Sequence, residues 1–188
     1  MHGKEDWSMA LAEEKIYTID DIYKLPEGER AQLFDGQMYM MAPPSREHQQ
    51  LVSELNYVIK DYIKKKRGDC QVYPAPFAVF LNADNKNYVE PDLSIICDKN
   101  KLDHKGCYGA PDWIIEIVSP SSRQIDYYRK LYKYQNAGVR EYWIVDKEKN
   151  RIIVHNFEKE TGEEYTFEDI VPAGIYEEFS VNFKEINL

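Results

Sequence analysis

The spacing of apolar residues predicts a long amphipathic helix over residues 45–66. Its apolar positions recur at intervals of four, three and four residues, while the lysines of the segment avoid that stripe. The stripe consists of Leu51, Leu55, Val58 and Tyr62. Because Ser45 is a good N-cap residue, the helix is expected to begin there and to bury one face.

Two further helices are expected on either side of this one. A short helix over residues 17–29 has Thr18 or Asp20 as its N-cap. A second long helix should cover residues 123–136, because Gly138 stands where a helix C-terminus favours glycine. The short helix is expected to pack on the outside of the molecule, and the later helix to bury one apolar face.

The strand pattern predicts an α/β fold with a mixed central sheet flanked by helices. Residues 113–119 form a continuous apolar run broken only by Glu116, which is typical of a central strand buried on both faces. An Asp35-Gly36 turn predicts an N-terminal hairpin over residues 33–41. Other strands are expected at 71–81, 88–97, 141–146 and 151–157, and a C-terminal β extension should contain a hairpin near 160–163 and an edge strand at 179–183.

Length and composition indicate one globular domain. The 188 residues suit a single domain spanning residues 1–188, with 1–15 expected to be a flexible N-terminal segment. The net charge of −9 argues against a non-specific nucleic-acid coat protein, which would depend on Lys and Arg to neutralise phosphates. It leaves open a nuclease, because such an enzyme needs carboxylates to hold metal.

Cysteine usage and hydropathy favour a cytoplasmic protein. The three cysteines, Cys70, Cys97 and Cys107, form no C-x-x-C pair, so neither a disulfide framework nor a thiolate zinc site is expected. Apolar runs are too short to span a bilayer, and no membrane partner is expected.

Two carboxylates are candidates for a metal site. Strand alternation places Asp92 on one face with Glu90 and Ser94, and it places Glu116 in the middle of an otherwise apolar strand. A buried carboxylate is costly unless it is paired or coordinates a cation. If the two strands are neighbours, Asp92 and Glu116 lie about 5 Å apart. Hard oxygen ligands favour Mg²⁺ or Mn²⁺ over zinc.

Asp112 competes with Asp92 for this role but is too far from Glu116. Four residues along one strand separate Cα atoms by about 13 Å, so the two side chains cannot share a metal. Asp112 is therefore interpreted as a strand-entry residue.

Lys130 is the candidate cation beside the carboxylates. It falls within the apolar stripe of the helix that follows the Glu116 strand, and Asp126 lies one turn away on its flank. Its ammonium can extend toward Asp92 and Glu116. The alternative is that the side chain snorkels to solvent.

The motifs Glu90-Pro91-Asp92, Glu116-Ile117-Val118 and Asp126-x-x-x-Lys130 resemble the Uma-two family of restriction endonucleases within the PD-(D/E)XK superfamily. The resemblance covers most of the chain and includes segments 34–36, 41–45, 109–112, 116–121 and 138–143, together with His48. It implies a restriction-endonuclease-like fold. The chain departs from the superfamily at Val118, where the usual lysine would stand, and Lys130 is the matching cation.

The resemblance implies a metal-dependent endonuclease that acts on DNA. Asp92, Glu116 and the main-chain carbonyl of Ile117 would bind Mg²⁺ or Mn²⁺, and Lys130 would orient the attacking water or stabilise charge on the phosphate. Glu54 would be a supporting or metal contact, or else a flanking surface glutamate. His48 is more often a packing residue than a base at such a position.

Two remaining features concern partners. A basic cluster, with Lys60, Lys64, Lys65, Lys66, Arg67, Arg123, Arg129 and Lys133, could contact DNA phosphates or form a solvated face. Restriction-type enzymes of this superfamily often act as homodimers, and Tyr128 and Tyr132 are candidates for the contact. The competing function is a catalytically degenerate nuclease fold that binds DNA or protein.

Overall fold

The computed structural model describes residues 15–186. The expected flexible segment 1–15 lies outside this range except for Lys15. The main sheet has six strands in the order β11-β10-β9-β8-β6-β3, with β8 and β9 parallel and the other pairs antiparallel. The mixed central sheet predicted from the sequence is therefore confirmed. Its strands are β3 (Gln71–Pro74), β6 (Leu93–Ile96), β8 (Trp113–Ile117), β9 (Glu141–Asp146), β10 (Arg151–Asn156) and β11 (Thr161–Tyr165).

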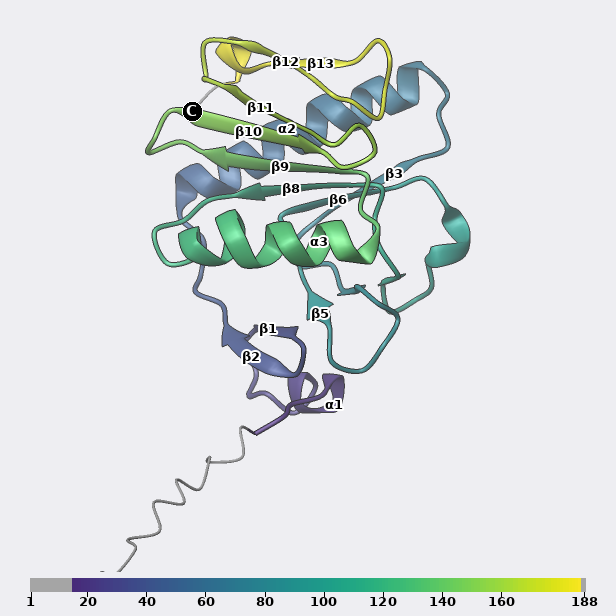
Figure 1. The fold of residues 1–188 in the computed structure, drawn as a ribbon, viewed down its shortest axis with the longest axis vertical. Coiled ribbons are helices and arrows are strands. Elements are labelled where there is room, and N and C mark those ends of the chain that lie inside the picture. The colour runs from purple at the N-terminus through teal and green to yellow at the C-terminus, as the bar shows by residue number, and fades with distance from the viewer. Residues whose placement is uncertain (1–14, 187–188) are drawn as a thin grey trace, which may run out of the picture.

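Two helices cover opposite faces of this sheet (Figure 1). On one face, α2 (Arg46–Lys65) packs its residues Leu51, Leu55 and Ile59 against the central strands. Ser45 caps α2 by accepting a hydrogen bond from the His48 N–H at 3.2 Å, as its sequence position predicted. On the other face, η2 (Ile125–Lys130) continues into α3 (Leu131–Ala137), which Gly138 ends in the left-handed conformation.

A smaller five-stranded sheet carries the N-terminal hairpin at one end of the molecule (Figure 1). The hairpin joins β1 (Ala31–Phe34) to β2 (Gln37–Met40), and Asp35 and Gly36 both adopt positive φ in the turn. The helix expected over residues 17–29 shortens to α1 (Ile19–Ile22), with Thr18 as N-cap. The other members are β4 (Val79–Phe80), β5 (Tyr88–Val89) and β7 (Cys107–Tyr108), and η1 (Lys99–Lys101) lies in the connection between β6 and β7.

Two strands expected to be continuous are each divided between the two sheets, so that part of the prediction was wrong. Residues 71–81 form β3 and β4, separated by the cis Ala75-Pro76 bond, and residues 88–97 form β5 and β6, separated by Pro91. Proline has no N–H to donate to a sheet, which favours a break at these points. Glu90, Pro91 and Asp92 lie between β5 and β6. The alternation of strand faces predicted from Glu90 to Ser94 is therefore interrupted before β6 begins.

The hairpin expected near residues 160–163 is formed by β10 and β11, which places β11 at the edge of the main sheet, whereas the rest of the C-terminal extension folds over the α2 face. β12 (Ile170–Pro172) and β13 (Ser180–Asn182) form their own two-stranded sheet, followed by η3 (Phe183–Glu185). Val171, Val181 and Phe183 enter the same apolar cluster as α2. The strand predicted at 179–183 is present as β13, and it pairs with β12 and not with a strand of the main sheet.

Cys70 and Cys97 form a disulfide, against the expectation from the sequence. They flank β3 and β6, whose antiparallel pairing brings Gln71 opposite Ile96 and so places the two cysteines side by side. Cysteine count and spacing cannot report such a pairing, because it arises from strand register. Cysteine usage consequently gives no support to a reducing compartment. Within residues 15–186, no helix combines the length and apolar character needed to cross a membrane.

Candidate active site

Strand register brings the two candidate carboxylates together. β6 and β8 pair with Leu93 opposite Ile115, so Asp92 and Glu116 are the next residues along their two strands. The backbone N–H of Ile117 donates to Asp92 Oδ2 at 2.8 Å. The Asp92 carbonyl in turn accepts from the Ala75 N–H at 3.0 Å, which fixes the chain where β6 begins. The predicted adjacency of the two strands is confirmed.

Glu116 lies at the centre of a buried hydrogen-bond network. Its side chain is 4% exposed, and its Oε1 contacts Lys130 Nζ at 2.8 Å and accepts from Tyr134 Oη at 2.6 Å. Lys130 Nζ also contacts Asp126 Oδ1 at 2.9 Å. The lysine therefore turns inward to the carboxylates and does not snorkel.

Lys130 lies in a segment with unusual helix geometry. Residues 125–130 form a π-helical segment, a form that carries more residues per turn than an α-helix and often occurs at functional sites. Both Asp126 and Lys130 are buried, and the Tyr142 hydroxyl donates to the Asp126 carbonyl at 2.9 Å. Tyr142 on β9 thereby anchors the first turn of the segment against the sheet. The sequence pattern alone predicted a regular helix.

The charges of the network depend on one another. Burial raises the pKa of Glu116 to about 7; the charge of Lys130 opposes this rise, while Asp92 and Asp126 add to it. Burial acts to lower the pKa of Lys130, but the charges of Asp126, Glu116 and Asp92 outweigh it, so this pKa is raised. Lys130 is thus a permanent cation. Glu116 is a carboxyl whose ionised form depends on positive charge nearby.

His48 belongs to the site, although its position on α2 suggested a packing residue. Its Nε2 lies 3.1 Å from Asp92 Oδ2, and the ring also contacts the backbone of Ile117. Burial acts to lower its pKa, but the hydrogen bond and charge of Asp92 and the charge of Glu116 raise it overall. Glu54 lies half-buried on the same helix and outside the residues that line the cleft described next.

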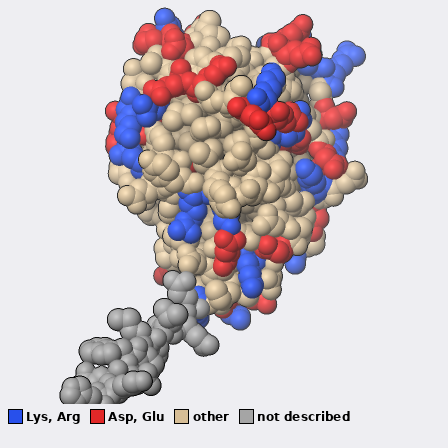
Figure 2. Space-filling model, viewed as in Figure 1, with Lys and Arg blue, Asp and Glu red and all other residues tan. Residues whose placement is uncertain are grey.

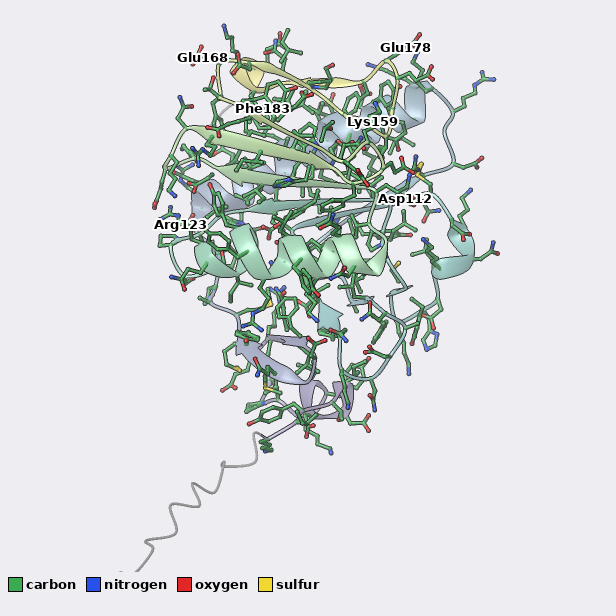
Figure 3. The ribbon with its side chains drawn as sticks, in the orientation of Figure 1. Asp112, Arg123, Lys159, Glu168, Glu178 and Phe183 are labelled. Atoms are coloured by element: carbon green, nitrogen blue, oxygen red, sulfur yellow. A yellow bond between two sulfur atoms is a disulfide. The ribbon has the colours of Figure 1, made fainter. Side chains whose placement is uncertain are left out.

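The site opens into a cleft of about 940 Å³. Its walls come from the β1–β2 hairpin, the start of α2, the loops after β3 and β8, and η2. Asp92, Glu116 and Lys130 all line it. Figure 3 shows Arg123 at one end of the η2–α3 helix and Asp112 at the opposite end of the sheet. Asp112 binds the Cys97 N–H at 2.7 Å and Arg140 Nη1 at 3.3 Å, in keeping with a structural residue at the entry of β8.

The oxygen groups of the site fit a hard divalent cation. Lys130 and Tyr134 both contact Oε1 of Glu116, while Ile117 and His48 both contact Oδ2 of Asp92, so neither set of bonds uses the second oxygen of either carboxylate. Among residues 15–186, no three His, Cys, Asp or Glu side chains form a ready metal cage. Mg²⁺ suits such a site, because it is often held by one or two carboxylates and keeps several waters.

The family model described as "Putative restriction endonuclease", that of the Uma2 (Uma-two) family, matches residues 19–181. The chain belongs to this family. Its fold is similar to that of a crystal structure from Anabaena variabilis described as a "putative nuclease belonging to DUF820", with a TM-score of 0.73 and 21% identity over 90% of this chain and 96% of that one. The chain is also 26% identical over 118 residues to "Uncharacterized protein slr1290" of Synechocystis, a match that covers 62% of this chain and spans 60% of that relative.

The predicted basic cluster does not gather at the cleft. Lys64 and Lys65 are the last residues of α2, so they lie about 24 Å or more along the helix axis from His48, and Lys66 and Arg67 follow them. Several cations of the predicted cluster have acidic partners: Lys65 pairs with Asp61, Lys66 with Glu178 and Arg123 with Asp146 and Glu148. Figure 2 shows acidic and basic side chains interspersed on the face that carries α3. The solvated-face interpretation fits this arrangement better than a phosphate-binding track.

Proposed function

We propose that this protein is a metal-dependent endonuclease that hydrolyses DNA phosphodiester bonds with Mg²⁺ or Mn²⁺ as cofactor. The observation that carries the proposal is the buried Lys130 ammonium, bonded to Glu116 beside Asp92 in the wall of an open cleft. A buried ion pair next to an additional carboxylate lowers the stability of the fold, because the charges lose their hydration. This cost favours a functional role for the three groups over a purely structural one. The family membership supports the same reaction class.

The residues of the site fall into those that would bind the metal and those that orient or complement its ligands. Asp92, Glu116 and the Ile117 carbonyl are the groups that would hold the cation, which when bound lowers the pKa of a water and stabilises phosphate charge. Lys130 and Tyr134 fix Oε1 of Glu116, so the carboxylate keeps one orientation. Lys130 also adds positive charge beside the position where phosphate charge develops. This lysine takes the place of the one missing at Val118.

Cleavage of supercoiled plasmid tests the proposal. The wild-type protein with Mg²⁺ or Mn²⁺ should nick or linearise the plasmid, and chelation of the metal should stop the reaction. Asp92→Asn and Glu116→Gln should each abolish cleavage, whereas Glu54→Gln is the matched control, because Glu54 lies outside the cleft. Calorimetric titration with Mn²⁺ gives a second readout: binding should be lost in the two cleft variants and kept in the control.

A specific observation also favours the competing function of a catalytically degenerate module. Six acidic residues line the cleft, namely Glu47, Glu90, Asp92, Glu116, Asp126 and Glu148, against three cations, Arg30, Lys130 and Lys147. Because a phosphodiester is negatively charged, this acidic cleft would repel it unless cations were bound there first. Absence of both cleavage and Mn²⁺ binding in the wild type would favour the degenerate module.

We also propose that the protein acts as a homodimer through α3 and η2. Tyr128 and Tyr132 are 75% and 64% exposed one turn apart, and Tyr is favoured at interfaces. Size-exclusion chromatography coupled to light scattering should give a dimer mass for the wild type and a monomer mass for Tyr128→Lys with Tyr132→Lys. A monomer mass for the wild type would refute this assembly.

A further inference from the structure

The β1–β2 hairpin forms a wall of the cleft that the metal site does not use. Its register pairs Gln32 with Tyr39, and the alternating residues Arg30, Gln32 and Phe34 all line the cleft together with Tyr39. Leu33, between them, points instead into a separate apolar cluster with Phe80 and Tyr88. One face of the hairpin therefore faces the cleft with a mixture of polar and aromatic groups.

Gln32 is buried in this wall with its amide poorly satisfied. The residue is 6% exposed, and its Oε1 has no hydrogen-bond partner. Its Nε2 donates to Met41 Sδ at 3.5 Å, and a thioether is a weak acceptor. Leaving a buried polar group unpaired costs about 1–3 kcal/mol, so such a group calls for an explanation. The Gln32 amide thus has an acceptor without a partner beside a donor with only a weak acceptor, and a ligand with complementary groups could bind both.

Aromatic groups flank this amide. Phe34 and Tyr39 pack edge to face with their ring centroids 5.6 Å apart, and the guanidinium of Arg129 lies 4.8 Å from the Tyr39 centroid. Bases of unpaired nucleotides are commonly bound by such rings together with hydrogen bonds to their edges. Met41, which covers the amide, is a flexible side chain that can move aside.

Arg30 connects this wall of the cleft to the metal site through a hydrogen bond to Glu90. Arg30 Nε donates to Glu90 Oε2 at 2.7 Å, and Tyr88 Oη donates to Glu90 Oε1 at 2.7 Å. Glu90 stands two residues before Asp92. A group held by Gln32 would therefore lie in the same cleft as the phosphate that the metal site attacks.

We propose that Gln32 binds the hydrogen-bonding edge of an unpaired nucleobase, so that the substrate class is DNA with unpaired nucleotides. The inference rests on the proposed nuclease function. Every nucleobase has a donor and an acceptor on its pairing edge, and in a duplex the opposite base occupies both. A glutamine recessed in a cleft wall cannot reach into a groove, so the base must leave the stack and enter the protein. The excess of acidic residues in the cleft also disfavours affinity from a long track of phosphates.

Fluorescence anisotropy in Ca²⁺ tests the inference without depending on cleavage. The probes are a labelled single strand, the same strand with one abasic position, its perfect duplex, and a duplex with a central mismatched bubble. The single strand and the bubble should bind more tightly than the perfect duplex. Gln32→Met should weaken binding of the single strand about tenfold, in line with one lost bidentate contact. Gln49→Met, at an exposed glutamine that also lines the cleft, should leave it unchanged.

A stability measurement separates ligand binding from a structural role. Gln32→Met replaces an unsatisfied amide with an apolar side chain of similar size, so its thermal midpoint should equal or exceed that of the wild type. A clear fall in the midpoint would mean that Gln32 is structural and would overturn the inference. Equal affinity for perfect duplex and single strand, or single-strand affinity unaffected by Gln32→Met, would also overturn it. Cleavage of the perfect duplex and of the bubble at equal rates would leave the nuclease function intact while refuting the unpaired-base site.

Discussion

Glu116→Gln should remove a pH-dependent loss of stability from the metal-free protein. Glutamine keeps an oxygen that can accept the bonds from Lys130 and Tyr134, but it cannot ionise. In the wild type, burial raises the pKa of Glu116 from 4.5 to about 7. Between these pH values the folded protein holds a proton that the unfolded chain has released. The contribution of Glu116 is therefore fully present below pH 4.5 and is lost as the pH rises through 7.

The size of this loss follows from the two pKa values. Each unit of difference corresponds to about 1.4 kcal/mol, so the free energy of unfolding should fall by about 3 kcal/mol from this group alone. In Glu116→Gln this component is absent. Relative to the wild type, the variant should thus gain about 3 kcal/mol between acidic and mildly alkaline pH.

Urea unfolding in EDTA across this pH range measures the difference. Comparison with the wild type cancels groups that titrate in both proteins, such as Glu141, whose pKa is also raised by burial. Glu54→Gln is the control and should follow the wild-type profile. Parallel profiles for Glu116→Gln and the wild type would refute the account of Glu116 as a destabilised buried carboxyl.

Two other predictions concern the network around Glu116, and a third concerns the cysteines. Lys130→Met should lower the free energy of unfolding at neutral pH by about 3–5 kcal/mol, because it leaves Glu116 and Asp126 buried without a cation; a urea midpoint close to wild type would contradict this. Tyr134→Phe should cost about 1–3 kcal/mol and weaken Mn²⁺ binding in calorimetry, since Glu116 Oε1 loses its hydroxyl donor; unchanged affinity would exclude a positioning role. Thiol titration of the unfolded, unreduced protein should find one thiol, Cys107, and three after reduction, whereas three before reduction would refute the Cys70–Cys97 disulfide.

The sequence determined the features that depend on local pattern. The stripe of α2, its Ser45 cap, the Asp35-Gly36 turn and the extent of β9 all follow from propensity and periodicity, which act over a few residues. The cost of burying Glu116 in an apolar strand also marked that residue as one needing partners. Lys130 followed from its position within an apolar helical stripe.

Tertiary structure alone decided which distant groups meet. The Cys70–Cys97 bond, the reach of His48 to Asp92 and the division of two expected strands between two sheets depend on register and on chain crossings. The bond from Tyr134 to Glu116 and the unpaired amide of Gln32 have no signature in the sequence. A pattern along one chain records which face a side chain occupies, whereas its partner is fixed only when another segment packs against that face.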